Sequence, residues 1–266
     1  MIFETHAHYE DEKFDPDRAE LLSSMGEYGI GRIINVGSSM ETSERSIALA
    51  HQYPFIYAAV GLHPDAVKSA TPENLDRLRT WTEDPRVVAI GEIGPDYHYE
   101  KDPAVRKLQL QAFRDQLDLA LETGLPVIVH SREAAADTME ILTEFAKKGG
   151  RGVIHCYSYS SDQALQYIKM GFFIGVGGVI TFKNGKKLRQ TVEAIPMEQI
   201  LLETDCPYMA PEPFRGERNS SRYLPYMVKA ISEIKGIRTG EVEDITWKNA
   251  LRLFTKIREK EPVWND

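Results

Sequence analysis

Short apolar segments that end in a polar residue constrain the fold of this chain most strongly. The sequence contains eight apolar segments with the length of β-strands, and five of them end in a histidine or a carboxylate. Helical patterns separate the segments, and this alternation is typical of proteins built on parallel strands. The segments cover residues 1–8, 31–37, 55–61, 86–92, 126–130, 152–155, 172–176 and 200–205.

The intervening helices have recognisable starts. Asp15-Pro16 opens a helical pattern that reaches Gly29, and Thr71 precedes Pro72 as a capping residue precedes a first helical position. Further helices are predicted near residues 40–52, 102–123 and 133–148, and two or three more after the last strand. The seventh strand is followed instead by a Gly-rich, basic segment that ends near Lys187.

This pattern predicts an α/β fold of the (β/α)₈ TIM-barrel type with extra C-terminal helices. The barrel typically takes about 250 residues and carries its chemistry at the carboxyl ends of its strands, and the chain has 266 residues. A doubly wound open sheet is the competing fold. The barrel is favoured because five different strands end in candidate functional groups, and only a closed ring brings all five ends around one centre. We expect a single domain over residues 1–266.

Net charge and cysteine content limit the binding partners and the cellular compartment that we expect. A net charge of −8 argues against non-specific binding of duplex nucleic acid. Divalent metals can reverse the local sign, so a phosphate substrate remains possible. Cys156 and Cys206 lack the spacing of a metal finger and suggest reduced thiols in the cytoplasm. The sequence has no apolar run long enough to span a membrane, so no membrane partner is expected.

His6 and His8 predict a metal site because side chains two residues apart on a strand point to the same face. Alone, the pair could be two solvent-facing histidines. Imidazoles and carboxylates at the other strand ends suit Zn²⁺, Mn²⁺, Fe or Mg²⁺. The complete candidate set is His6, His8, Glu92, His130, His155 and Asp205.

Six such groups exceed the needs of one tetrahedral ion, so we expect two divalent metals with Glu92 as the bridging carboxylate. Two metals suit hydrolysis, since one ion can polarise the scissile group while the other activates water. Asp205 is expected to accept the proton of that water. For each residue alone there is a structural alternative: His130 or His155 could be a hydrogen-bonded structural histidine, and Asp205 could cap a helix.

Seven strings together resemble the TatD family of metal-dependent hydrolases. They are ETHAH, GLHP, GEIGPDYH, PVIVHSREA, GVIHCYS, LLETDCPY and RGERN, and they follow in this order across nearly the whole chain. The resemblance implies the distorted TIM barrel of the amidohydrolase superfamily and a deoxyribonuclease activity that depends on Mg²⁺ or Mn²⁺, with Zn²⁺ also able to occupy the site. It implies metal ligation by the same six residues.

Several positions depart from the family's pattern without removing a ligand. Most belong to loops over the expected site, which leaves the metal chemistry intact and the substrate open. The departures are Glu4 in place of Asp, Ala7 where a small residue or Cys is usual, Asp65 in place of the second histidine of HPH, Pro95 in place of Leu, Tyr159 in place of Gly, and Ser220-Ser221.

Phosphate contacts are expected from one histidine and three arginines near the site, because a guanidinium group forms paired hydrogen bonds with phosphate oxygens. They are His63, Arg132, Arg215 and Arg218. The alternative is that these arginines are solvated or paired with carboxylates. Tyr157 and Tyr159 could stack an unpaired base or could be packing residues.

The leading hypothesis is a metal-dependent deoxyribonuclease of the 3′–5′ exonuclease type that acts on DNA or other nucleic-acid ends and needs no obligate protein partner. An amide or ester hydrolase, such as a D-aminoacyl-tRNA deacylase, keeps the same site and changes the bond. A non-catalytic metal-bound scaffold is disfavoured because the full ligand set and Asp205 are present. The phosphotriesterase type carries a lysine at the fourth strand, where this chain has Glu92.

Overall fold

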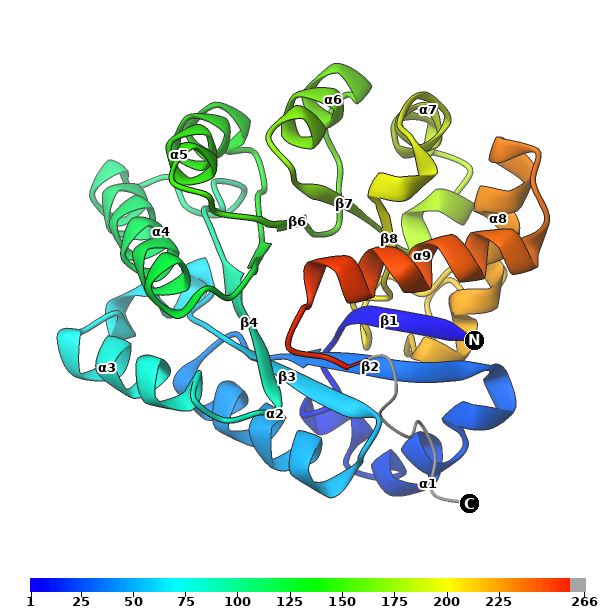
Figure 1. Ribbon diagram of the computed structural model, residues 1–266, viewed down its shortest axis with the longest axis horizontal. Helices are drawn as coiled ribbons and strands as arrows, with labels where there is room; N and C mark the ends of the chain where they lie inside the picture. Colours follow the sequence, from blue (N-terminus) through cyan, green and yellow to red (C-terminus); the bar gives the residue numbers. More distant parts are fainter. Residues whose placement is uncertain (259–266) are drawn as a thin grey trace.

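A computed structural model describes residues 1–258. Its eight parallel strands lie in one sheet in the order β1 to β8, so that neighbours in sequence are neighbours in space (Figure 1). This order is that of a (β/α)₈ barrel, and it excludes the doubly wound sheet, whose strand order reverses at a switch point. The strands are β1 (Ile2–Ala7), β2 (Ile30–Val36), β3 (Ile56–Val60), β4 (Val87–Ile93), β5 (Val127–Val129), β6 (Gly152–Ile154), β7 (Phe173–Val176) and β8 (Ile200–Leu202).

Each strand is followed by one α-helix, and one further helix comes after the eighth unit. The helices surround the strands, and α9 lies beside β1 and α8 (Figure 1). The barrel helices are α1 (Arg18–Ser23), α2 (Met40–Gln52), α3 (Pro72–Trp81), α4 (Pro103–Thr123), α5 (Ala135–Lys147), α6 (Ser161–Lys169), α7 (Lys186–Ala194) and α8 (Leu224–Lys235), and the additional one is α9 (Thr239–Leu253). Within residues 1–258, no helix has both the length and the apolar character that crossing a bilayer requires.

The first helical region differs from the continuous helix that the sequence predicts over 15–29. Helix α1 ends at Ser23, and a 3₁₀ helix, Met25–Tyr28, follows it and stops at Gly29, which has a left-handed φ of 72°. The Ser24 hydroxyl donates to the Leu21 carbonyl at 2.8 Å. A serine that bonds back to the preceding turn competes with the helical pattern, so the helix is broken there. The Gly-rich, basic segment after β7 contains a 3₁₀ helix, Gly178–Thr181, and its last two residues, Lys186 and Lys187, begin α7.

The first and last strands meet at a seam that closes the barrel. Thr5 Oγ1 donates to the Leu202 carbonyl at 2.9 Å. Just beyond the strands, His8 N donates to the Cys206 carbonyl and Asp205 N donates to the His6 carbonyl, each at 2.9 Å. Backbone groups on the edges of an open sheet would otherwise lack partners. The seam therefore holds three candidate ligands against one another.

Two apolar cores lie on the two sides of the sheet. The outer core fills the space between strands and helices. The inner core takes residues from all eight strands and from the end of α9, including Leu253 and Phe254. The Lys256 ammonium donates to the carbonyls of Thr82, Asp84 and Val87, which lie at the start of β4. The end of α9 thus plugs the amino-terminal end of the barrel, opposite the candidate site.

An irregularity in β1 aims its histidines into the barrel. Phe3 belongs to the inner core, and His6, three residues further on, also points into the barrel. Regular alternation would put residues three apart on opposite faces. The pairing of β1 with β2 shifts register between Glu4 and Ala7, and such bulges commonly re-aim side chains beside active sites.

Candidate metal centre

The structure brings the six sequence-predicted ligands together at the carboxyl ends of the strands. His6 lies in β1 and Glu92 in β4, and the other four follow β1, β5, β6 and β8 within three residues. His6 is fully buried, and the Asp205 side chain retains 22% of its accessible surface. The arrangement confirms the fold-level expectation that five strand ends converge on one centre.

One group of ligand atoms forms around His6, His8 and Asp205. The two histidine Nε2 atoms are 3.1 Å apart. Asp205 Oδ1 lies 3.4 Å from His8 Nε2 and 3.8 Å from His6 Nε2. Glu92 Oε2 lies 3.6 Å from His6 Nε2 and 3.8 Å from His8 Nε2.

A second group forms around the other oxygen of Glu92. Glu92 Oε1 is 2.9 Å from His130 Nδ1 and 3.0 Å from His155 Nε2. His63 Nε2 is 4.0 Å from the same oxygen, and its ring meets that of His130 edge-on. The two oxygens of one carboxylate therefore face two different sets of imidazoles.

Both groups fit a divalent metal. Four ligands at about 2.1 Å around a tetrahedral ion are about 3.4 Å from one another, and the measured separations in the first group run from 3.1 to 3.8 Å. His6, His8 and Asp205 can converge on one ion, as can His63, Glu92 and His130. The donors are imidazole nitrogens and carboxylate oxygens, the mixture that Zn²⁺, Mn²⁺ and related ions accept.

The two carboxylates in the cluster are held in their charged forms. Burial by itself raises the pKa of Glu92, but the positive potential of His155 and hydrogen bonds with His130 and His155 bring that pKa well below its ordinary value. Burial also raises the pKa of Asp205, and its interaction with His8 outweighs this effect and lowers the pKa. Both side chains therefore remain anionic, as metal ligands must be.

The net pKa shifts of the imidazoles differ in direction, although Glu92 acts to raise the pKa of His6, His130 and His155 alike. Burial lowers the pKa of His130, yet its hydrogen bonds with Asp96 and Glu92 raise that pKa to about 9. Glu92 and Glu203 likewise raise the pKa of His155 despite its burial. Burial and the neighbouring His155 lower the pKa of His6. The cluster without metal thus carries protons on some of its histidines, which ions must displace.

Two carboxylates that support the candidate ligands His130 and His155 were not predicted from the sequence. Asp96 Oδ2 lies 2.9 Å from His130 Nε2. Glu203 is buried, accepts a hydrogen bond from Cys156 N at 2.5 Å and lies 3.6 Å from His155 Nδ1. Carboxylates behind ligand histidines fix the orientation of the rings. The available signal was position, since Asp96 follows β4 and Glu203 directly follows β8.

His8 is oriented in the same way from its outer side. Its Nδ1 is 2.7 Å from the Val36 carbonyl oxygen and 3.4 Å from Glu10 Oε1. Glu10 is itself buried and accepts a hydrogen bond from Asn35 Nδ2 at 2.7 Å. The ring of His8 is therefore fixed with Nε2 facing His6 and Asp205.

Two of the predicted phosphate contacts lie in exposed positions on loops at the carboxyl ends of the strands. Arg132 follows β5, and its guanidinium lies 5.2 Å from the ring centre of Tyr99. Arg215 follows β8 and stacks on Phe182 at 3.7 Å. His63, by contrast, lies beside Glu92 within the cluster.

Arg218 and the two tyrosines have other partners. Arg218 donates to both carboxylate oxygens of Asp17, at 2.7 and 2.5 Å, and to the Lys13 carbonyl. Tyr157 is 3% exposed, and its hydroxyl donates to the Ser160 carbonyl at 2.6 Å. Tyr159 is half-buried and its hydroxyl is 2.9 Å from Ser131 Oγ. The structure does not bring these three side chains to the metal cluster as free contacts.

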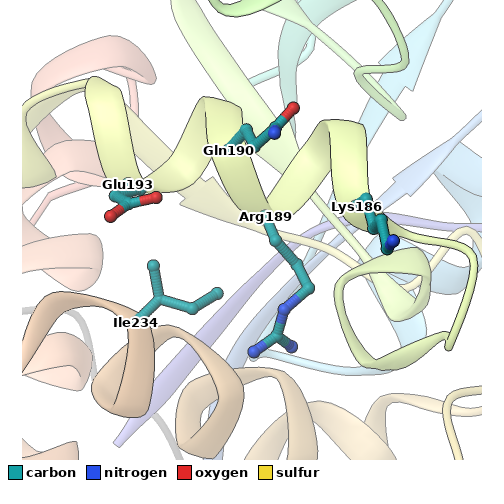
Figure 2. Close-up of a pocket in the computed structure, with 5 residues that line it drawn as sticks. All are labelled: Lys186, Arg189, Gln190, Glu193 and Ile234. Atoms are coloured by element: carbon teal, nitrogen blue, oxygen red, sulfur yellow. The ribbon is translucent and has the colours of Figure 1, made fainter.

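An open pocket of about 300 Å³ lies elsewhere on the molecule. Figure 2 shows that it is formed by side chains of α7 and by Ile234 of α8, which face each other on the outside of the barrel. None of the six candidate ligands lines it. The candidate centre is therefore defined by its cluster of titratable groups and not by the pocket in Figure 2.

Comparison with known proteins identifies the family of this chain. The family model for TatD related DNases matches residues 3–255. An uncharacterized metal-dependent hydrolase of Bacillus subtilis, YabD, is 40% identical over 254 residues, covering 96% of this chain and 99% of its own. The 3′–5′ ssDNA/RNA exonuclease TatD of Cronobacter sakazakii is 32% identical over 261 residues, covering 96% and 98%.

A solved structure agrees in both sequence and shape. The crystal structure of the TatD homologue YJJV from Escherichia coli superposes with a TM-score of 0.88 at 31% identity, and the match covers 96% of this chain and 98% of that one. The family model spans nearly all of the described residues, and the relatives match over almost their full lengths. The chain therefore belongs to the TatD family of metal-dependent hydrolases.

Proposed function

We propose that this chain is a 3′–5′ exonuclease that hydrolyses phosphodiester bonds at the ends of single-stranded DNA or RNA. It would use two divalent cations, Mg²⁺ or Mn²⁺, at a site that Zn²⁺ can also occupy. The division of the Glu92 carboxylate carries this proposal: Oε2 faces His6 and His8, whereas Oε1 faces His130 and His155. A carboxylate between two sets of donors is suited to bridge a pair of ions.

The residues divide into two sets of ligands. His6, His8 and Asp205 would hold one ion, His130 and His155 the other, and Glu92 would be shared. When bound, the ions would supply Lewis-acid polarisation of the phosphate and lower the pKa of water. Asp96 and Glu203 keep the rings of His130 and His155 in place. Glu92 thus acts both as a ligand and as the element that fixes the spacing of the two sets.

Asp205 is suited to accept a proton from the attacking water. Its lowered pKa keeps it ionised at neutral pH. Its backbone N–H is fixed by the His6 carbonyl at 2.9 Å. The side chain is the most exposed of the carboxylates in the cluster, at 22%, and so it can reach a group that enters from the mouth. A general base needs this combination of ionisation, fixed position and access.

The substrate class is supported by a relative and by the charges around the site. The Cronobacter sakazakii protein that is 32% identical is a 3′–5′ ssDNA/RNA exonuclease by name. Arg132 and Arg215 are exposed on loops after β5 and β8, and His63 lies 4.0 Å from Glu92, in a chain that carries a net charge of −8. A small cationic patch on an acidic protein suits short or single-stranded ends better than long duplex. We propose a cytoplasmic location, which the free thiols of Cys156 and Cys206 fit.

The decisive experiment combines metal removal with one substitution. EDTA should abolish degradation of a 3′-labelled oligonucleotide, and Mg²⁺ or Mn²⁺ should restore it. Asp205→Asn should reduce kcat by about 10² or more, since removing a general base typically costs that factor, while the thermal unfolding profile remains close to that of the wild type. Undiminished cleavage by a thoroughly metal-stripped protein would overturn the proposal. Turnover of D-aminoacyl-tRNA without any oligonucleotide cleavage would favour an ester hydrolase that uses the same site.

A further inference from the structure

Aromatic rings paired with cations connect neighbouring loops around the mouth of the barrel. Lys13 Nζ, after β1, lies 4.3 Å from the ring centre of Tyr208, after β8. Arg132, after β5, lies 5.2 Å from the ring centre of Tyr99, after β4. In both pairs the two residues come from adjacent strands and lie on the side of the barrel that carries the metal cluster.

The two tyrosines differ from the other rings near the site in their exposure. Tyr99 is 79% exposed and Tyr208 is 47% exposed, whereas Tyr157 is 3% exposed. The stacking role that the sequence suggested for Tyr157 therefore has better candidates in Tyr99 and Tyr208. Exposed tyrosine faces are the common platform for unpaired bases.

Their positions flank the metal cluster. Tyr208 N donates to the Asp205 carbonyl at 2.9 Å, so this ring is anchored one turn away from a candidate ligand. Tyr99 is three residues beyond Asp96, which contacts His130. Because β4 and β8 are four strands apart in a ring of eight, the loops that carry the two tyrosines start on opposite sides of the barrel.

We propose that Tyr99 and Tyr208 are two base-stacking platforms that bind unpaired nucleotides on opposite sides of the phosphate to be cleaved. Arg132 and Lys13, each over one face of its tyrosine ring, contact the adjoining phosphates, and a base stacks on the opposite face. The inference depends on the proposed nuclease function for its choice of nucleic acid as ligand. It gives a structural reason for the single-stranded substrate, since a paired and stacked base offers no free face to either ring.

The test measures binding separately from cleavage. A fluorescent single-stranded decathymidylate is titrated in the Asp205→Asn background with Mn²⁺, where cleavage should be at least about a hundredfold slower and Kd is measured before the strand is degraded. Tyr99→Ala and Tyr208→Ala should each raise Kd about tenfold, which corresponds to about 1.4 kcal/mol and lies within the range for one stacked base. The double variant should raise Kd about a hundredfold, because the two rings are far apart and act independently.

Three controls separate stacking from other effects. Tyr99→Phe and Tyr208→Phe keep the ring and should keep Kd within about twofold. Tyr28→Ala removes a tyrosine of similar exposure, 41%, just before the amino end of β2, and should leave Kd unchanged. An oligonucleotide of abasic residues should bind the parent protein weakly and should bind the alanine variants no more weakly.

Two results would overturn the proposal: an unchanged Kd in both alanine variants, or an equal loss of affinity for the normal and the abasic strand. The nuclease function is judged by a different measurement, the cleavage of decathymidylate by the protein with Asp205 intact. Tyrosine-dependent binding without cleavage would reject the nuclease and keep the platforms. Cleavage together with Kd values that do not change in the Tyr99 and Tyr208 variants would keep the nuclease function and reject the platforms.

Discussion

Ser221 donates a hydrogen bond of 2.9 Å to Glu4, 217 residues away in the sequence. Glu4 is completely buried in β1, and its oxygens also accept from His6 N, Thr204 N and Thr204 Oγ1. Burial raises the pKa of this carboxyl to about 8, although those hydrogen bonds act to lower it. One side chain thus joins the strand of His6 and His8 to the loop of Asp205. Glu4 and Ser221 are both departures from the family's pattern, and they contact each other.

Ser221→Ala should lower the free energy of unfolding by about 2 kcal/mol, because it removes one hydrogen-bond donor of the buried Glu4 carboxyl and the acceptor of the Tyr9 hydroxyl. Urea unfolding at neutral pH measures the loss. Ser23→Ala is the matched control, since the Ser23 hydroxyl bonds only within an exposed helix turn. Equal effects of the two substitutions would contradict the importance of the Glu4–Ser221 contact.

Phe254→Ala should destabilise the protein by about 4 kcal/mol, the usual cost of removing a fully buried phenylalanine. Phe254 fills the amino-terminal end of the barrel and has no exposed surface. Leu251→Ala, on the same helix but only partly buried, should cost less than half as much. Denaturant titrations of both variants make the comparison, and equal midpoints would show that α9 does not plug the barrel.

Asp84→Asn should lower the free energy of unfolding by about 1 kcal/mol at pH 7, in line with one partly exposed ion pair and its hydrogen bonds. Burial raises the Asp84 pKa, but hydrogen bonds from His51 at 2.7 Å and Arg86 N lower it below its ordinary value. A carboxyl with a lowered folded pKa stabilises the fold above its unfolded pKa of about 3.9 and loses that contribution as the pH falls through the folded value.

The difference in unfolding free energy between Asp84→Asn and the wild type should therefore decrease below about pH 4. Unfolding free energies measured at several pH values test this trend. Asp244→Asn removes the same charge from an exposed position on α9 and should show no such trend. A loss that persists undiminished in acid would assign the effect of Asp84 to packing.

Mn²⁺ should stabilise the protein against heat. At a free concentration of about 100 times Kd, each ion adds about 2.7 kcal/mol to the free energy of unfolding. His130→Ala removes a contact with Glu92 and should reduce this gain, whereas His51→Ala, outside the cluster, should retain it. Scanning calorimetry with and without Mn²⁺ distinguishes them. The same gain in all three proteins would exclude His130 as a ligand.

Arg132 and Arg218 should respond differently to substitution. Arg132 is exposed on the loop after β5, and Arg132→Ala should reduce the slope of log Kd against log salt by about 0.7, the value for one lost phosphate contact on a single strand. Arg218→Ala should instead lower stability, because it leaves Asp17 unpaired, and should change the slope little. Oligonucleotide binding at several salt concentrations, together with melting curves, measures both effects.

The barrel and the convergence of the six candidate ligands could be predicted because each strand carries its own signal. Runs such as residues 126–130 and 152–155 are apolar and end in histidine, so the strand and the ligand are read from the same few letters. Ring closure then follows from counting strands. The prediction of one continuous helix over 15–29 was wrong because a side-chain hydrogen bond, from the Ser24 hydroxyl to the Leu21 carbonyl, breaks the helix after α1.

The environment of single loop residues could not be predicted. Arg218 pairs with Asp17 across 201 positions in the sequence, and no local pattern indicates this contact. Tyr157 is buried because Tyr167 of α6 packs beside it, while Tyr99 protrudes from a loop. Asp96 supports His130 only because the β4 and β5 loops meet in the fold. These properties arise from the packing of distant segments.

The seam between β1 and β8 sets the order in which the site can mature during synthesis. His6 and His8 leave the ribosome first, but their backbone partners are Asp205 and Cys206. Because the ribosome adds about 5–20 residues per second, His6 and His8 are without these partners until the segment of Asp205 and Cys206 has been made. A nascent or truncated chain that lacks the last strand holds two histidines without their anchor. The full set of candidate ligands thus comes together only after β8 and the loop that follows it have been made.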